Sequence, residues 1–305
     1  MIRLAMTSAT ATKAKPSRRP WWLSQPSTAF LRDPHFYTKY DLVWSTLAIA
    51  LSATLWFALD WRGFDVAFTM ANAPLLVGLF FLAAYLQVMA GVFIHNGAHE
   101  NFPRPMNRLW SELMGSVVCT RFASWEILHR YHHMHTDDTT LDPHPVNPGF
   151  WRFFFVKMVN GLEKNLRHQY LERWGDTPET RARDTRRTLY SGATGLLLVG
   201  TWFVLLGPVL FLVVFLPALV CGAVHVSHFN WVTHNAAEGN EGDYRPTNLD
   251  TGVYWLANRV LFGLYMHANH HAYLKLFNPL KIPSEQAARV DQKISTHRVR
   301  RGLSE

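Results

Sequence analysis

The sequence predicts an all-α polytopic membrane protein with four transmembrane helices in two hairpins. A cytoplasmic helical cap is expected to hold a histidine-rich site for two metal ions. Three observations predict this class: long stretches without charged residues, an uneven distribution of Lys and Arg, and three groups of closely spaced histidines. Of the 305 residues, 49% are hydrophobic and 17% are charged, which is enough apolar material for several spans.

Three segments without Asp, Glu, Lys or Arg predict the spans, and these segments are residues 42–59, 66–94 and 188–237. A helix of about 20 apolar residues crosses the roughly 30 Å hydrocarbon core of a bilayer. The third segment is too long for one span, and its apolar part contains Gly207-Pro208, a turn signal. We therefore expect spans at about 42–59, 70–94, 189–206 and 209–226, the last two joined by a tight hairpin. The alternative for each segment is a buried core helix of a soluble protein.

The basic residues predict the orientation in the membrane. Every Lys and Arg except Arg62 lies within residues 1–41, 96–187 or 227–305. Because cytoplasmic loops of membrane proteins are rich in Lys and Arg, we expect both termini and the histidine-bearing segments in the cytoplasm. The formal net charge of +8 suits the anionic headgroups of a lipid bilayer and requires no nucleic acid partner.

The polar segments complete the predicted organisation. Residues 1–40 form an N-terminal cytoplasmic tail, for which an organellar transit peptide is the alternative. The membrane domain covers 41–285, and 286–305 form a basic C-terminal tail. Inside the domain we expect an amphipathic helix at 149–162, in the membrane interface or against the cap, a solvated helix and then a loop at 163–187, a loop at 235–248 and an apolar helix at 249–273.

The histidines predict the chemistry. His95 and His99 are spaced i, i+4, whereas His129, His132 and His133 are spaced i, i+3, i+4, and His267, His270 and His271 repeat that spacing. On a helix such residues share one face, so each group directs its imidazoles to one point. Neutral imidazole binds iron, copper, zinc and nickel, and eight ligands suit two ions rather than one. The spacing alone does not identify the metal.

Other interpretations explain less of this pattern. A haem protein needs only two axial histidines and leaves most of these residues unexplained. Any single histidine could be a solvated or core residue without a role in metal binding. This alternative does not explain three regularly spaced groups on one side of the membrane. Cys119 and Cys221 lie far apart in the sequence, so they indicate neither a disulfide framework nor a zinc ribbon, and two cysteines cannot build a four-cysteine iron–sulfur cluster.

Over about residues 40–285 the chain resembles the integral-membrane fatty acid desaturases and hydroxylases with their three histidine boxes. "HNGAH" (95–99) is similar to the first box, "HRYHH" (129–133) to the second and "HANHH" (267–271) to the third. "TTLDPHPVNPGFW" after the second box and "NHHAY" at the end of the third add to the likeness. The resemblance implies two non-haem iron ions, oxygen as co-substrate, and electrons from a separate carrier such as a ferredoxin, a rubredoxin or a cytochrome.

The resemblance also implies one further histidine ligand before the third box. In "NWVTH", His234 is the favoured ligand and Asn230 is expected to hold a metal through a water molecule, while His225 and His228 compete as less favoured ligands. His135 and His144 are expected to be structural or to support the ligands. The carboxylates expected to accept the second ring N–H of the ligands are Glu100, Glu126, Asp137, Asp138 and Asp142.

The resulting functional prediction is a membrane-bound fatty acyl desaturase that acts on a free acid, a thioester or a lipid-linked chain. A hydroxylase or ketolase, or an oxidative decarboxylase that gives a terminal alkene, shares the same boxes. A histidine-rich metal transporter or sensor is the alternative from another class. A transport path requires ionisable residues inside the spans, and residues 42–59 and 66–94 contain none that ionise at neutral pH.

Overall fold

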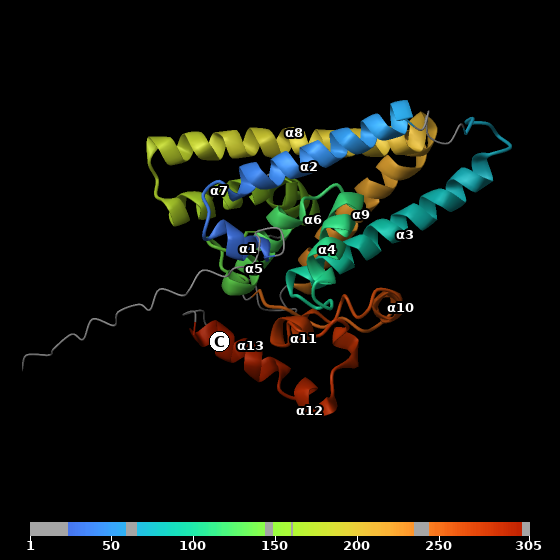
Figure 1. The fold of residues 1–305 in the computed structure, drawn as a ribbon. Helices are drawn as coiled ribbons and strands as arrows, with labels where there is room; N and C mark the ends of the chain where they lie inside the picture. The colour runs from blue at the N-terminus through green and yellow to red at the C-terminus, as the bar shows by residue number, and fades with distance from the viewer. Residues whose placement is uncertain (1–23, 59–65, 144–148, 160, 235–243, 301–305) are drawn as a thin grey trace, which may run out of the picture.

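The computed structural model describes residues 24–58, 66–143, 149–159, 161–234 and 244–300. His144 and most of the predicted loop at 235–248 therefore lie outside the described residues. All regular elements within the described ranges are helical (Figure 1). In chain order they are α1 (Pro26–Phe30), α2 (Phe36–Ala53), η2 (Thr54–Ala58), α3 (Ala73–Ala98), α4 (Met106–Val117), α5 (Phe122–His135), α6 (Phe150–Arg152), η3 (Phe153–Val159), α7 (Gly161–Trp174), α8 (Pro178–Val209), η4 (Leu210–Phe215), α9 (Leu216–Thr233), α10 (Val253–Val260), α11 (His267–Ala272), η5 (Pro279–Lys281), α12 (Ser284–Ala287) and α13 (Val290–Arg300).

Within the part of the chain that the structure describes, three helical segments are long and apolar enough to cross a membrane, namely Phe36–Ala58, Ala73–Ala98 and Pro178–Thr233. Only 11%, 28% and 33% of their most apolar windows are buried inside the protein, so most of this apolar surface faces outward. Phe57, for example, is 81% exposed. Helices that are apolar on all sides and not covered by protein are suited to lipid, which makes the chain an integral membrane protein.

The third segment is longer than one span and bends at Gly207. This residue has φ 71° and ψ 168°, a left-handed conformation that favours glycine, and Pro208 follows it. Beyond the bend, η4 and α9 run back from the far end of α8 (Figure 1). We expected four separate spans, whereas the structure has three candidate segments, the last of which bends at the predicted turn.

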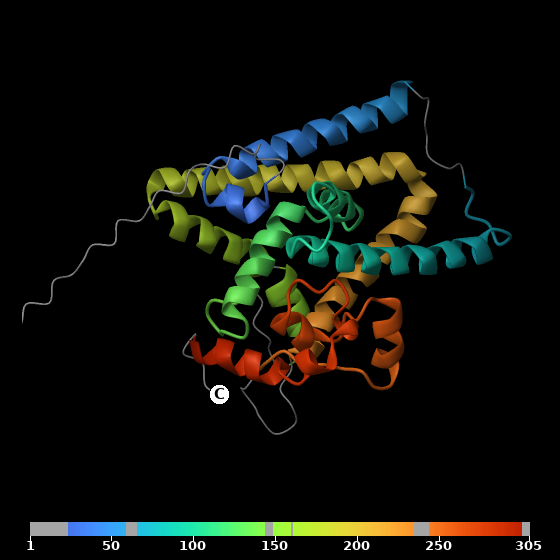
Figure 2. The same ribbon diagram turned by 60° about the horizontal axis from the view of Figure 1, so that its bottom comes forward.

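The long helices pack in pairs, α2 against α8 and α3 against α9. Hydroxyl contacts between Ser45 and Thr194 (2.9 Å) and between Ser52 and Thr201 (3.0 Å) join α2 to α8. At the end of the molecule away from α8, the short helices α10 to α13 are gathered, and α13 packs on α11 (Figures 1 and 2). The third histidine motif belongs to this group, in α11, and its rings contact those of the first two motifs.

Three segments differ from the sequence prediction. The solvated loop expected before residue 188 is mostly helix, because Thr177 caps α8 by accepting a hydrogen bond from the Thr180 backbone N–H, and Pro178 occupies the first turn. The single apolar helix expected at 249–273 is two helices, because Phe262 (φ 54°) and Gly263 (φ 72°) interrupt it. Residues 290–300, assigned to the C-terminal tail, form α13.

Candidate metal centre

Four helices deliver the histidines to one place: α3, α5 and α9 do so from their C-terminal ends, whereas the short helix α11 begins at His267 and carries the third motif along its length. His95 lies in the last turn of α3, and His99 directly follows that helix. The second motif lies in the last two turns of α5, the third motif lies in α11, and His234 directly follows α9. Convergence of these helices brings residues more than 170 positions apart in the sequence into contact, as His95 and His270 show.

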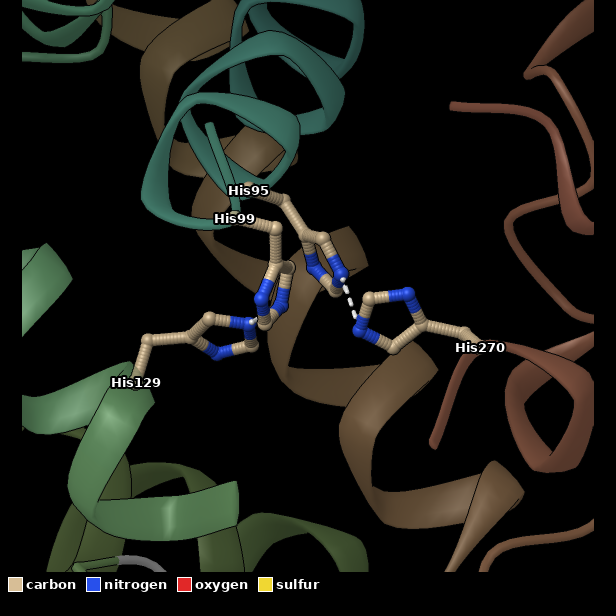
Figure 3. Close-up of side chains that lie close together, drawn as sticks. All are labelled: His95, His99, His129 and His270. Carbon is tan, nitrogen blue, oxygen red and sulfur yellow. Dashed lines mark hydrogen bonds between the residues drawn. The ribbon is translucent and has the colours of Figure 1, made fainter. Parts of the chain in front are cut away.

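The first group of four histidines, cluster A, consists of His95, His99, His129 and His270. The Nε2 atoms of His95 and His270 are 2.8 Å apart, and those of His99 and His129 are also 2.8 Å apart. Figure 3 shows the four rings directed at one another from α3, α5 and α11. All four side chains are buried.

The second group, cluster B, consists of His132, His234, His267 and His271. His267 Nε2 lies 2.9 Å from His234 Nε2 and 3.0 Å from His271 Nε2. The His132 ring centroid is 5.0 Å from that of His234. In each cluster the candidate ligand atoms all lie within 4.8 Å of one another.

His133 lies between the two clusters. Its Nε2 atom is 3.1 Å from His129 Nε2 and 3.2 Å from His270 Nε2, both in cluster A. Its ring is also 4.2 Å, centroid to centroid, from that of His271 in cluster B. All nine histidines expected as metal ligands are therefore gathered in one place.

Burial keeps these imidazoles uncharged. Desolvation, followed by repulsion from neighbouring histidines, holds the pKa values of His99, His129, His133, His270 and His271 well below the usual value of 6.5. A neutral imidazole keeps a lone pair that can bind a metal ion.

Two carboxylates contact cluster B directly. His132 Nδ1 lies 3.0 Å from both carboxylate oxygens of Asp142, and His234 Nδ1 lies 2.9 Å from Asp137 Oδ1. A carboxylate at Nδ1 fixes the proton there and leaves the Nε2 lone pair free to face a metal ion. The Asp137 backbone N–H donates to Asp142 Oδ2 at 2.8 Å, which joins the two carboxylates into one unit.

The other three candidate carboxylates serve the protein scaffold. Glu100 pairs with Arg104, and Glu126 accepts hydrogen bonds from Ser27. Asp138 accepts from the backbone N–H groups of Thr140 and Leu141. The sequence identified all five carboxylates as candidates to support the ligands. It did not distinguish the two that contact histidine from these three.

The less favoured ligands His225 and His228 belong to neither cluster. His225 packs against Tyr265, with ring centroids 6.0 Å apart, and His228 packs against Phe150 at 5.7 Å. His135 contacts Tyr131 at 4.4 Å. Asn230 is buried, and its side-chain N–H donates to the Val226 carbonyl at 2.8 Å, which is a contact within α9.

Further polar contacts hold the histidine motifs in place, and these contacts were not predicted from the sequence. The Lys275 ammonium donates to the His99 carbonyl at 2.6 Å. Asn269, inside the third motif, exchanges hydrogen bonds with Asn248 at 2.9 and 3.1 Å and also donates to the Pro279 carbonyl at 3.1 Å. These contacts join residues that are close in space through the fold, so no local spacing indicates them.

The residues present suit two metal ions. Among the described residues, eight imidazoles form two sets of four. Imidazole nitrogens bind such ions at about 2.0–2.1 Å, and two nitrogens 2.8–3.0 Å apart can both reach one ion at that distance. The carboxylates at Nδ1 supply the support that metal-binding histidines commonly have.

A cleft gives access to the centre. It encloses about 1130 Å³, and three of the histidines, His99, His133 and His271, line it. Its walls come from α1, α5, α7 and α13 together with residues 271–275. Molecules of considerable size can therefore approach both clusters from this side.

Comparison with known proteins agrees with the geometry. Residues 71–294 match the family model described as fatty acid desaturase. The chain is 27% identical over 279 residues to the sn-1 stearoyl-lipid 9-desaturase of Synechocystis sp., covering 88% of this chain and 74% of that protein. It is 26% identical over 215 residues to the enzyme of that name from Anabaena variabilis (68% and 73%), and 28% identical over 157 residues to the sn-2 palmitoyl-lipid 9-desaturase of Nostoc sp. (49% and 51%). No solved structure matches the chain significantly.

Proposed function

This chain belongs to the fatty acid desaturase family, and we propose that it is a membrane-bound, oxygen-dependent di-iron enzyme that introduces a double bond into an acyl chain. The observation that supports this proposal most directly is the pair of clusters A and B, which offer eight buried imidazoles. A double bond forms when two adjacent methylenes each lose one hydrogen. With two electrons and two protons supplied from outside, these hydrogens account for the reduction of one oxygen molecule to two water molecules.

The proposed chemistry requires a redox metal. Two iron ions held by the clusters would supply the oxygen chemistry that attack on an unactivated C–H bond requires, and zinc cannot supply it because it has no redox states. The histidines of clusters A and B, together with His133, act as ligands and not as acid–base catalysts. Asp137 and Asp142 hold the Nδ1 protons of His234 and His132, so that Nε2 faces the ion.

The cleft is the proposed route to the centre. Its lining combines apolar side chains such as Ile127 and Leu274 with the three histidines His99, His133 and His271 and with charged side chains from α5, α7 and α13. The apolar walls suit an acyl chain, since burying each CH₂ group contributes about 0.8 kcal/mol to binding. Because the similar proteins act, by their names, on stearoyl-lipid and palmitoyl-lipid, we propose a lipid-linked chain as the substrate.

We also propose four spans, with both termini and the metal centre on the cytoplasmic side. The bend at Gly207 divides the long third segment into two arms, which supports a second hairpin. The Lys and Arg distribution supports the orientation. Electrons are expected from a separate ferredoxin, rubredoxin or cytochrome, because the chain has only two cysteines.

Lipid analysis of cells that express the protein tests this function. The wild type is expected to add an unsaturated acyl chain to the membrane lipids, and purified protein to hold about two irons per chain. His132→Ala is expected to remove the product. His225→Ala is the matched control, because His225 lies on α9 outside both clusters and its product should remain. A hydroxylated lipid or a terminal alkene as the product would assign the chain to the alternative reactions and refute desaturation.

A further inference from the structure

The two histidine clusters have different electrostatic surroundings. In cluster B, His132 and His234 each face a carboxylate, Asp142 at 3.0 Å and Asp137 at 2.9 Å. Among the residues that the structure describes, no carboxylate oxygen within hydrogen-bond distance faces a ring nitrogen of cluster A. The charged group bonded there is the Lys275 ammonium, which donates to the His99 carbonyl at 2.6 Å and lies 3.5 Å from Glu100.

This difference has a direct effect on a bound cation. A carboxylate that accepts the Nδ1 proton makes Nε2 a stronger donor and adds negative charge near the ion. The Lys275 ammonium near cluster A supplies no such negative charge, and its own effect on a bound ion is screened because its side chain is 69% exposed and lies 3.5 Å from Glu100. The two carboxylates therefore supply negative charge to cluster B, whereas the additional group that contacts the Nε2 atoms of cluster A is His133, an imidazole.

The backbone supports the two carboxylates. Asp137 has φ 64°, a left-handed conformation that is uncommon for residues other than glycine. This conformation is held by the Asp137 N–H bond to Asp142 Oδ2 (2.8 Å) and by the side-chain bond to His234. One short segment after α5 thus aims both carboxylates at cluster B, and residues in unfavourable conformations of this kind often belong to functional sites.

We propose that the two metal sites are unequal: cluster B binds a divalent cation more tightly, and cluster A releases its ion first. Asp137 and Asp142 act as positioning residues for this difference. The inference rests on the proposed function in one respect, because it requires that both clusters bind metal.

Titration with Co²⁺ of the full-length purified protein, first stripped with a chelator, tests the proposal. The bound metal is counted by elemental analysis, and the visible absorption of Co²⁺ follows each binding step. We expect one tight and one weaker equivalent. Asp142→Asn or Asp137→Asn should weaken the tight equivalent about 10- to 100-fold and leave the weaker one unchanged.

Two variants provide the control and the assignment. Asp138→Asn changes a carboxylate on the same segment that bonds only Thr140 and Leu141, so both affinities should stay the same. His99→Ala should remove the weaker equivalent and keep the tight one, because His99 belongs to cluster A.

The outcomes separate this inference from the proposed function. Two equivalents of equal affinity in the wild type, or a weaker equivalent that responds to Asp142→Asn, would overturn the inference while a two-metal centre stands. Fewer than two equivalents in the wild type would instead contradict the two-metal centre itself.

Discussion

Gly97, in the middle of the first histidine motif, lies where α3 meets α4, and its replacement by alanine should disturb the metal centre. A Cβ atom at this position would lie 1.8 Å from Ser111 Oγ and 2.8 Å from Ser111 Cβ. The hydroxyl can rotate away, but the Cβ atom can move only with the backbone of α4. Carbon atoms pack best at about 3.5–4.0 Å, so the two helices must separate by at least about 0.7 Å.

The expected loss follows from these distances. Overpacking of this kind costs about 1–3 kcal/mol of stability. His95 and His99 flank Gly97 and move with it, whereas metal–ligand distances tolerate only about 0.2 Å. Gly97→Ala should therefore lower both the metal content per chain and the thermal unfolding temperature of the purified protein.

Two variants make this prediction specific. Gly78→Ala lies in the same helix, and a Cβ atom there meets nothing within 4 Å, so this variant should retain its metal. Adding Ser111→Gly to Gly97→Ala removes the clashing atoms and should restore much of the metal content. The reasoning is wrong if Gly97→Ala binds as much metal as Gly78→Ala, or if the double variant gives no recovery.

Three further predictions follow from the structure. Glu126→Ala removes the buried carboxylate that accepts two hydrogen bonds from Ser27 (2.7 and 2.8 Å), each of which contributes about 1.5–3 kcal/mol to stability. The thermal unfolding temperature of this variant should therefore fall further than that of Glu126→Gln. Equal unfolding temperatures for the two variants would contradict this prediction. Leu274→Trp should narrow the cleft and lower kcat/KM for a long acyl substrate, while the iron content stays unchanged. An unchanged kcat/KM would exclude the cleft as the path of the substrate to the metal centre. The cluster histidines outside the spans have lowered pKa values in the folded state, so the unfolded chain takes up protons first, near pH 6.5. The stability that their neutral forms provide is present above that pH and is lost as the pH falls, so the unfolding temperature of metal-free protein should decrease between about pH 7 and pH 5; a rise would contradict this sign.

The histidine motifs could be predicted from the sequence because helical spacing converts directly into direction. Successive residues turn by about 100°, so on one helix face position i+4 lies about 40° to one side of position i, and position i+3 lies about 60° to the other side. In the second motif, His129 belongs to cluster A and His132 to cluster B. In the third motif the assignment is reversed, since His267 and His271 belong to cluster B and His270 to cluster A. The spacing predicted that the rings converge, but this partition depends on how α5 and α11 face each other.

Other features depend on contacts that no local pattern contains. Asp137 and Asp142 differ from Asp138 only in where one short segment directs their side chains, and the left-handed backbone at Asp137 is part of that geometry. The interruption between α10 and α11 arises in the same way, because Phe262 adopts φ 54° in a segment that is apolar enough to continue as a helix.

The meeting of three helix C-termini at the centre has an electrostatic consequence. The last carbonyl groups of a helix give its C-terminus a partial negative charge, equivalent to about half an elementary charge for a long helix. Helices α3, α5 and α9 present this end to clusters A and B. Neutral imidazoles bring no charge of their own to balance a doubly charged ion. The peptide dipoles of these three helices therefore add negative potential on both sides of the centre, including the side where Asp137 and Asp142 are absent.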